Sequence, residues 1–313
     1  MAEKLATREA YGNALVELAE KYDFVVLDAD LAEATKTVKF KKAYPNRFFD
    51  CGIAEGNMMS VAAGIASTGK PVFASSFAMF AAGRAFEQVR NSIGYPHLNV
   101  KIGATHAGIT VGEDGATHQC NEDIALMRTI PGMTIVNPAD AVEARAAVEV
   151  ALKTEGPFYL RFGRAAMPIF NDEKTYKFEL GKGVELAKGK DVTIVATGIM
   201  VSAALEAKEL LAAEGIDAGV VNIHTIKPLD TALIAKVAKA SGAIVTAEEH
   251  NIIGGLGSAV AEALAENCPV PMVRVGVKDT YGHSGPVPTL LEAYGLTPAD
   301  IVAAAKAAVA KKA

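Results

Sequence analysis

The 313-residue sequence lacks features that would assign it at once to several classes of protein. Its three cysteines are far apart and form no CxxC pair, which argues against a disulfide framework or a thiolate zinc site and favours a reducing cytoplasm. It has no long basic run and a net charge of −5, so nothing indicates binding to nucleic acid or to an anionic membrane. No apolar run approaches the ~20 residues of a membrane helix. The N-terminus begins an amphipathic helical pattern, so we expect no signal peptide.

Several common catalytic and binding motifs are absent as well. The sequence has no GxxxxGK[ST] segment and no GxSxG segment, which disfavours a P-loop NTPase and an α/β-hydrolase. Residues 254–257 (Gly-Gly-Leu-Gly) do not form a GxGxxG motif and support a dinucleotide site only weakly. No recognised metal-ligand spacing occurs, so we predict no metal site in this chain. Three histidines of the second half are interpreted as structural or interfacial: His224, His250 and His283.

The sequence does contain an alternation of short apolar runs and helical patterns. Half of the residues are apolar and 21% are charged, which is ordinary globular composition, and the length corresponds to about two domains. Short β-rich runs between helices are typical of a mainly parallel sheet that helices cover on both faces. After a first helix capped by Thr7, strands are predicted near 24–27, 47–50, 71–75, 100–103, 134–136 and 158–161, with helices near 35–43, 57–67, 78–93, 121–129 and 139–154.

Residues 166–188 interrupt this alternation. The segment is rich in lysine, glycine and acidic residues and has no long apolar period, so we predict a linker. A second series follows, with strands near 192–196, 218–223, 243–247 and 272–276 and helices near 200–214, 231–240, 257–266 and 299–311. The prediction is therefore an α/β protein of two domains, residues 1–165 and 189–313, each with a mainly parallel sheet flanked by helices.

Polar and aromatic residues follow the predicted strands of the first domain. In an open parallel sheet, ligands bind outside the carboxyl ends of the strands. The residues expected at this rim are Asp28 and Asp30 after the first strand, Glu55 after the second, Phe77 and Phe80 after the third, Thr105 and His106 after the fourth, and Arg164 after the last. Their convergence on one edge, more than any single residue, indicates a functional site.

Some of these residues have simpler explanations. Glu55 lies at the start of a predicted helix, where an acidic side chain stabilises the helix by ~0.3–1 kcal/mol. Phe77 and Phe80 have the i, i+3 spacing of ordinary core residues. Arg8, near the start of the first helix, is explained by a facing anion or by an ordinary exposed position.

The loop between His106 and His118 has a stronger functional signal. It is rich in glycine and polar residues, and functional histidines concentrate in such loops, whereas a buried structural histidine would be unusual there. Asp114 within it is also compatible with plain turn chemistry.

Taken in order, these segments resemble the C-terminal half of transketolase. The resemblance runs through Thr7-Arg8, residues 28–32 (Asp-Ala-Asp-Leu-Ala), 52–55 (Gly-Ile-Ala-Glu), 76–80 (Ser-Phe-Ala-Met-Phe), Thr105-His106, 112–119 (Gly-Glu-Asp-Gly-Ala-Thr-His-Gln) and 281–285 (Tyr-Gly-His-Ser-Gly). The family's N-terminal domain, which holds the diphosphate and the metal of thiamine diphosphate, has no counterpart in this sequence. The resemblance thus implies the pyrimidine-binding and C-terminal domains alone, as the small subunit of a split transketolase. A separate N-terminal subunit would carry the diphosphate site and its Mg²⁺ or Ca²⁺.

The resemblance also implies roles for individual residues. Glu55 would contact N1′ of the aminopyrimidine of thiamine diphosphate, Phe77 and Phe80 would pack against that ring, and Asp30 matches an aspartate near the thiazolium. His106, Asp114 and His118 would bind sugar hydroxyls, with His118 also helping proton transfer, while Arg8 and Arg164 would bind the substrate phosphate. The catalytic set is then Glu55, His118 and His106.

Two positions depart from the family pattern. Gly83, followed by Arg84, stands where transketolases often have a tyrosine near the pyrimidine, and Ala34 replaces a phosphate-binding serine. Thr35 and Thr37 are the candidates to replace that serine.

The expected activity is transfer of a two-carbon glycolaldehyde unit between sugar phosphates, as in the pentose phosphate pathway, by a cytoplasmic heterotetramer of two chains of each kind. Three alternatives stay open: a subunit of a split 1-deoxyxylulose-5-phosphate synthase, the β subunit of a 2-oxoacid dehydrogenase, and a non-catalytic assembly subunit.

Overall fold

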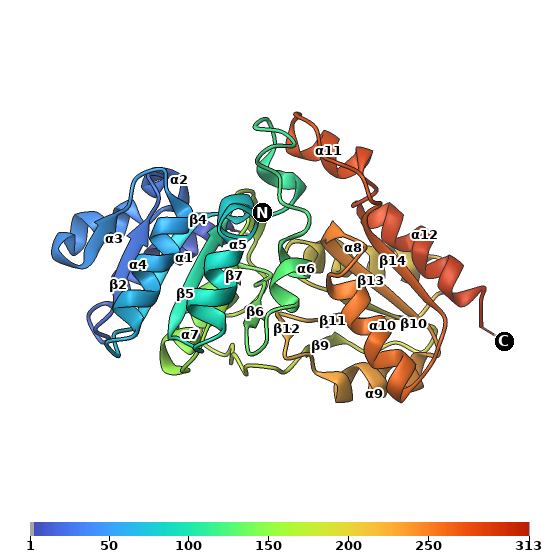
Figure 1. Ribbon diagram of the computed structural model, residues 1–313. Coiled ribbons are helices and arrows are strands. Elements are labelled where there is room, and N and C mark those ends of the chain that lie inside the picture. Colours follow the sequence, from blue (N-terminus) through green and yellow to red (C-terminus); the bar gives the residue numbers. More distant parts are fainter. Residues whose placement is uncertain (1–2, 313) are drawn as a thin grey trace.

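The structure, a computed structural model, describes residues 3–312 and contains two α/β units side by side (Figure 1). The first sheet has seven strands in the order β12-β6-β7-β5-β4-β2-β3. All neighbouring strands are parallel except the pair of β12 and β6. The strands are β2 (Val25–Asp28), β3 (Phe48–Asp50), β4 (Val72–Phe77), β5 (Val100–Thr105), β6 (Thr134–Val136), β7 (Phe158–Arg161) and β12 (Thr225–Lys227).

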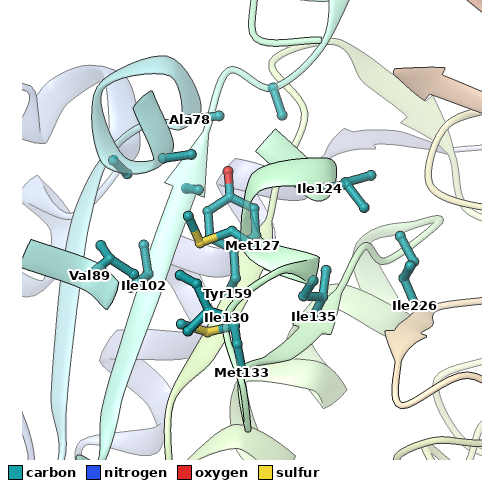
Figure 2. Close-up of a cluster of buried hydrophobic side chains, with 14 of the residues drawn as sticks. Ala78, Val89, Ile102, Ile124, Met127, Ile130, Met133, Ile135, Tyr159 and Ile226 are labelled. Atoms are coloured by element: carbon teal, nitrogen blue, oxygen red, sulfur yellow. The ribbon is translucent and has the colours of Figure 1, made fainter. Parts of the chain in front are cut away.

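The central strands of this sheet present apolar residues in both directions. Helices therefore cover both faces of the sheet and bury these strands on both sides. One face packs against α1 (Thr7–Leu18), α3 (Val38–Ala43) and α7 (Ala141–Lys153). The other face packs against α4 (Glu55–Ala66) and α6 (Asp123–Arg128), and Figure 2 shows part of that core, with Tyr159 of β7 beside Met127 of α6.

The second sheet has five strands in the order β14-β13-β10-β11-β9. Only its edge strand β9 is antiparallel to its neighbour. The strands are β9 (Val184–Ala187), β10 (Val192–Ala196), β11 (Ala218–Asn222), β13 (Ile244–Asn251) and β14 (Met272–Val277). The helices are α8 (Met200–Ala213), α9 (Thr231–Ser241), α10 (Leu256–Asn267), α11 (Val287–Ala293) and α12 (Pro298–Val309). The predicted fold class, two mainly parallel sheets flanked by helices, is confirmed.

The two units share packing. Strand β12 follows the second sheet's β11 in sequence but pairs with β6 of the first sheet. One continuous apolar cluster contains residues of both halves. Figure 2 shows three of its members, Ile226 of β12 with Ile124 and Ile135 of the first unit. No helix among residues 3–312 is long and apolar enough to cross a membrane.

The segment expected to be a linker, residues 166–188, carries two short strands. Strand β8 (Ala166–Pro168) pairs with β1 (Lys4–Ala6) in a separate two-stranded sheet, and β9 closes the edge of the second sheet. Strands of three or four residues contain too little alternation to stand out in the sequence, and their partners are distant along the chain.

The region 78–93, predicted as one helix, is π-helical over much of its length. It divides into η2 (Met79–Arg84), α5 (Phe86–Gln88) and η3 (Val89–Gly94). The predicted cap of the first helix is wrong: α1 begins at Thr7 itself, and the Thr7 hydroxyl accepts a hydrogen bond from the Gly163 amide at 2.8 Å. The remaining short elements are α2 (Ala32–Thr35), η1 (Pro45–Arg47) and η4 (Ile109–Val111).

Candidate active site

The candidate site lies at the carboxyl edge of the first sheet. Strand β2 has β3 on one side and β4 on the other. After β3 the chain crosses back to the other side of β2, so the strand order reverses between β2 and β4. Ligands of open α/β sheets bind at such switch points. Phe77 ends β4 and Thr105 ends β5, and His106 follows directly.

Two phenylalanines and two histidines form one cluster of rings at this edge. The Phe77 ring stacks on His106, with ring centres 3.8 Å apart, and on Phe80, with centres 5.8 Å apart and planes 10° apart. His118 meets Phe80 edge-on at 5.4 Å and Phe77 at 6.1 Å. The structure therefore brings together residues from three separate segments of the sequence, as the rim argument predicts.

His106 is fixed by hydrogen bonds at both ring nitrogens. Arg8 Nη1 lies 2.9 Å from Nε2, and because a guanidinium can only donate, Nε2 is the acceptor and the ring proton is on Nδ1. The Nδ1–H then donates to Thr105 Oγ1 at 2.9 Å. His106 also adopts a left-handed backbone, φ +56°, a strained conformation that clusters at functional sites.

The surroundings keep His106 neutral. The residue is 2% exposed, and burial, reinforced by the positive charges of Arg8 and Arg164, lowers the pKa of its imidazole to about 3. Lys36 and His118 act in the same direction, more weakly. His106 is therefore a hydrogen-bonding group at neutral pH, in a region that favours an anion.

Glu55 is the first residue of α4 and is 1% exposed. Its Oε2 accepts a hydrogen bond from Arg84 Nη1 at 2.9 Å, and the Arg84 guanidinium carbon lies 4.5 Å from the centre of the Phe80 ring. At the end of η2, Ala85 N donates to Phe80 O at 3.2 Å. This five-residue separation is that of a π-helical turn, which is wide enough to bring Phe80 and Arg84 to one side. Arg84 thus links the buried carboxyl group to the aromatic pair.

The loop from His106 to Gln119 is held closely. Arg164 Nη1 donates to the Val111 carbonyl and lies 3.1 Å from Glu113 Oε2, so this arginine is tied to the loop. Thr117 Oγ1 lies 2.9 Å from His118 Nδ1. Asp114 is exposed, and no hydrogen bond or ion pair of its side chain is seen among residues 3–312.

Asp28 accepts hydrogen bonds from Thr35 and Thr37, the two candidates to replace the family's phosphate-binding serine. Thr35 Oγ1 and Thr37 Oγ1 donate to Asp28 Oδ2 at 2.7 and 2.8 Å, and both threonines are fully buried, so neither hydroxyl is free to bind a phosphate. Burial raises the pKa of the Asp28 carboxyl to about 6. At Ala34 the backbone carbonyl accepts from Arg8 Nη1 at 2.9 Å.

Asp30 lies apart from the ring cluster. It is exposed, has φ +63°, and its amide donates to Asp50 Oδ1 at 3.1 Å. Within residues 3–312, no hydrogen bond or ion pair of its side chain is seen.

A cavity of about 690 Å³ opens beside Phe80 and Arg84. Its walls come from both units, with Thr117 and Gln119 on the first and Asn251 and Tyr281 on the second. Tyr281 is 90% exposed there. The described residues contain no group of three His, Cys, Asp or Glu side chains that could hold a metal ion.

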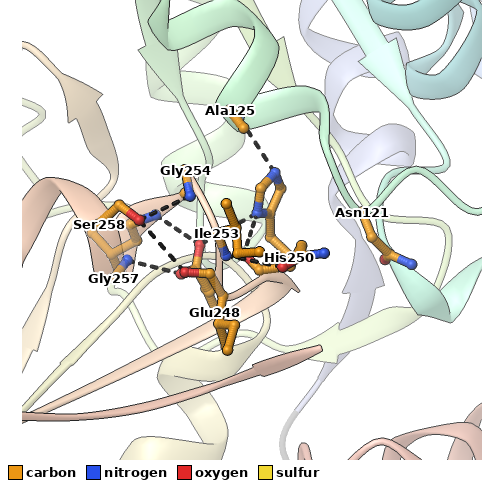
Figure 3. A network of polar contacts seen from close by, with 12 residues as sticks. Asn121, Ala125, Glu248, His250, Ile253, Gly254, Gly257 and Ser258 are labelled. Carbon is orange, nitrogen blue, oxygen red and sulfur yellow. Dashed lines mark hydrogen bonds and ion pairs between the residues drawn. The ribbon is translucent and has the colours of Figure 1, made fainter. Parts of the chain in front are cut away.

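Of the three histidines of the second half, His224 and His250 are buried and His283 is exposed. Burial lowers the pKa of both His224 and His250 to about 4. Figure 3 shows the His250 ring directed at the Ala125 amide of α6, which donates to Nε2 at 3.3 Å.

Sequence reasoning missed the role of Arg84, which it named only as the residue after Gly83. An arginine four residues after Phe80 in a predicted helix was the available signal, because such spacing allows contact. The contact with Glu55, 29 residues away, could not be predicted in this way.

Comparison with known proteins identifies the family of the two units. Residues 3–169 match the family described as transketolase, pyrimidine binding domain, and residues 181–301 match transketolase, C-terminal domain. A protein of Methanocaldococcus jannaschii named as a transketolase C-terminal section is 50% identical over 292 residues, 92% of each chain. The 6-deoxy-6-sulfo-D-fructose transketolase subunit SqwH of a Clostridium species is 47% identical over 97% of this chain and 95% of that one.

A solved structure described as a split gene transketolase, inactive beta4 tetramer, superposes with a TM-score of 0.93 and 56% identity, covering 99% of this chain and 100% of that one. Fold and sequence therefore define a protein built of a pyrimidine-binding domain followed by a C-terminal domain. The chain belongs to the transketolase family.

Proposed function

We propose that the chain is the C-terminal subunit of a thiamine diphosphate-dependent transketolase, which moves a glycolaldehyde unit from a ketose phosphate to an aldose phosphate. A separate N-terminal subunit supplies the diphosphate site with its Mg²⁺ or Ca²⁺, and the two kinds of chain form a heterotetramer. The observation that carries this proposal is the buried Glu55 carboxyl group, which Arg84 links to the stacked rings of Phe77 and Phe80.

The residues present fit the pyrimidine ring of this cofactor. Phe77 and Phe80 offer a flat apolar surface to a planar ring. Glu55, at the start of α4, would hydrogen-bond ring nitrogen N1′ of the cofactor through its carboxyl group. When bound, the cofactor supplies the nucleophilic carbon and the electron sink that cleavage of a carbon–carbon bond requires.

The surroundings of His106 suit a sugar phosphate. Neutral His106 can exchange its Arg8 hydrogen bond for one to a sugar hydroxyl, whereas His118, at the edge of the ring cluster, moves a proton to or from the reacting oxygen. Arg8 and Arg164 bind the phosphate through guanidinium N–H groups, which match phosphate oxygens in geometry and charge. Asp114 is available to a sugar hydroxyl because its side chain is exposed. Asp30 is proposed to lie near the thiazolium.

The test uses the assembled complex with Glu55→Gln, which replaces the carboxyl group by an amide of the same shape that cannot exchange a proton with the ring. We expect normal assembly and at least a ~100-fold loss of ketol transfer, the range of a general acid–base group. Glu87→Gln, at an exposed glutamate of α5, is the matched control. Turnover of Glu55→Gln within a few-fold of the wild type would disprove the assignment.

The same assay separates the alternatives. Release of carbon dioxide from a 2-oxoacid, with no transfer from ketose phosphates, would identify a synthase or a dehydrogenase subunit. A wild-type complex that assembles and binds thiamine diphosphate without turning over either kind of substrate would indicate an assembly subunit.

A further inference from the structure

The C-terminal unit contacts the loop of residues 106–119, called here the histidine loop, at several points. Thr110 N donates to Glu249 Oε1 at 2.6 Å, and Gln119 Nε2 donates to the His283 carbonyl at 3.0 Å. Helix α11 packs on η4 within the loop, and Figure 1 shows these two elements adjacent at the top of the molecule. The loop is therefore held between the two units.

The contact at Glu249 is the closest of these. A Cβ atom at Gly108 would lie 2.3 Å from Glu249 Cδ, and Gly108 has φ +78°. Glycine is therefore required here for two reasons: no side chain fits, and the backbone conformation favours glycine. Glu249 is 3% exposed and Thr110 is fully buried, so water does not compete for the hydrogen bond.

Glu249 is itself fixed from the first unit. Its backbone carbonyl accepts from Arg161 Nη2 at 2.9 Å, and Arg161 Nε pairs with Asp123 Oδ2 at 2.8 Å. Arg161 ends β7 of the first sheet, and all three residues are buried. The Glu249 carboxyl group is thus attached to a rigid sheet and reaches the loop that carries both site histidines.

We infer that Glu249 is a positioning residue, through which the C-terminal domain holds the histidine loop in the conformation that binds substrate. This inference rests on the proposed function for its catalytic consequence. It gives the C-terminal domain a task in the reaction, although that domain supplies none of the residues proposed to touch cofactor or sugar.

The neighbouring Glu248 provides a matched control. Adjacent residues of a strand point to opposite faces, and Glu248 accepts from Leu256 N and Gly257 N of α10 at 2.7 and 2.8 Å, away from the histidine loop. Figure 3 shows the Glu248 carboxyl group beside Gly257. Both glutamates are buried, and burial raises the pKa of each to about 7, so they differ mainly in what they contact.

The experiment compares Glu249→Met, Glu249→Gln and Glu248→Met in the assembled complex. Methionine keeps the volume and removes the acceptor, whereas glutamine keeps an acceptor for Thr110 N. Hydrogen exchange of peptides covering 106–119 and β10 is measured, with KM for the sugar phosphate and the dissociation constant of thiamine diphosphate. For Glu249→Met we expect exchange of the histidine loop to rise by about ten-fold or more, because the buried Thr110 N–H loses the acceptor that Glu249 provides.

We further expect KM to rise by a similar factor in Glu249→Met, while cofactor binding stays within two-fold. Glu249→Gln should restore both values, and Glu248→Met should leave the loop as in the wild type. Unchanged loop exchange in Glu249→Met, or exchange raised equally in β10, overturns the inference. If Glu249→Met does not fold, Gly108→Ala takes its place in the experiment. The added methyl group at residue 108 would displace the Glu249 carboxyl group from Thr110 N. A wild-type complex without ketol transfer would refute the proposed function instead, because the exchange measurement does not depend on turnover.

Discussion

Histidine 106 allows a quantitative test of the site's electrostatics. An unfolded histidine titrates near 6.5, whereas burial and the nearby arginines lower the pKa of His106 in the folded protein to about 3. Between these values the unfolded chain binds a proton that the native protein does not, so the stability of the native state falls as pH falls below 6.5. Well below pH 6.5 each pH unit costs about 1.4 kcal/mol of stability, so lowering the pH from 7.5 to 4.5 should cost about 3 kcal/mol from this residue.

His106→Asn isolates this contribution. The Asn side chain keeps a donor and an acceptor without titrating, and asparagine tolerates the left-handed backbone at φ +56°. The free energy of unfolding in urea is measured for the wild type and the variant at pH 7.5 and 4.5. The difference between the two proteins should shift by about 3 kcal/mol in favour of the variant at the lower pH.

His97→Asn serves as the control, because His97 is an exposed histidine with a similar φ of +55°. A difference between wild type and His106→Asn that does not change with pH would refute the lowered pKa of His106.

Two arginines give further predictions. Arg84→Met removes the group that hydrogen-bonds Glu55 and lies over Phe80, where the pyrimidine is proposed to bind. The cofactor would have to break this pair in order to bind, and a half-exposed charge pair is worth about 1 kcal/mol. Calorimetry on the assembled complex should therefore show roughly five-fold tighter binding of thiamine diphosphate to Arg84→Met. Weaker binding would mean that Arg84 helps to hold the cofactor. Arg164→Met should raise KM for phosphorylated sugars by about ten-fold or more, since hydrogen bonds to charged groups contribute about 1.5–3 kcal/mol. KM for free sugars should change little, and equal effects on both would show that Arg164 acts by holding the Val111 carbonyl and not by binding phosphate.

The strands and the rim were predictable because they depend on local patterns. Strands β4 and β5 are apolar runs buried on both faces, and the parallel arrangement follows from their alternation with helices. The rule that ligands bind at the carboxyl ends of such strands then places Phe77 and His106 at one edge. The structure brings these two rings to 3.8 Å from each other.

The partners of the charged and polar side chains were not predictable in this way. Thr35 and Thr37 look like free hydroxyls in the sequence, yet both donate to Asp28, because the turn after β2 folds back over the strand end. Strands of three residues, such as β8, show no clear period, and their pairing depends on a partner more than 150 residues away (Lys4 with Pro168).

The sequence by itself determined two mainly parallel α/β units and the residues at one sheet edge, because periodicity and glycine placement act over a few residues. Only the tertiary structure decided that Arg84 engages Glu55 and that Glu249 reaches Thr110 across 139 residues. Such contacts depend on how whole elements pack and on the direction of each side chain. No local pattern carries that information, and so these two contacts could be seen only in the packed structure.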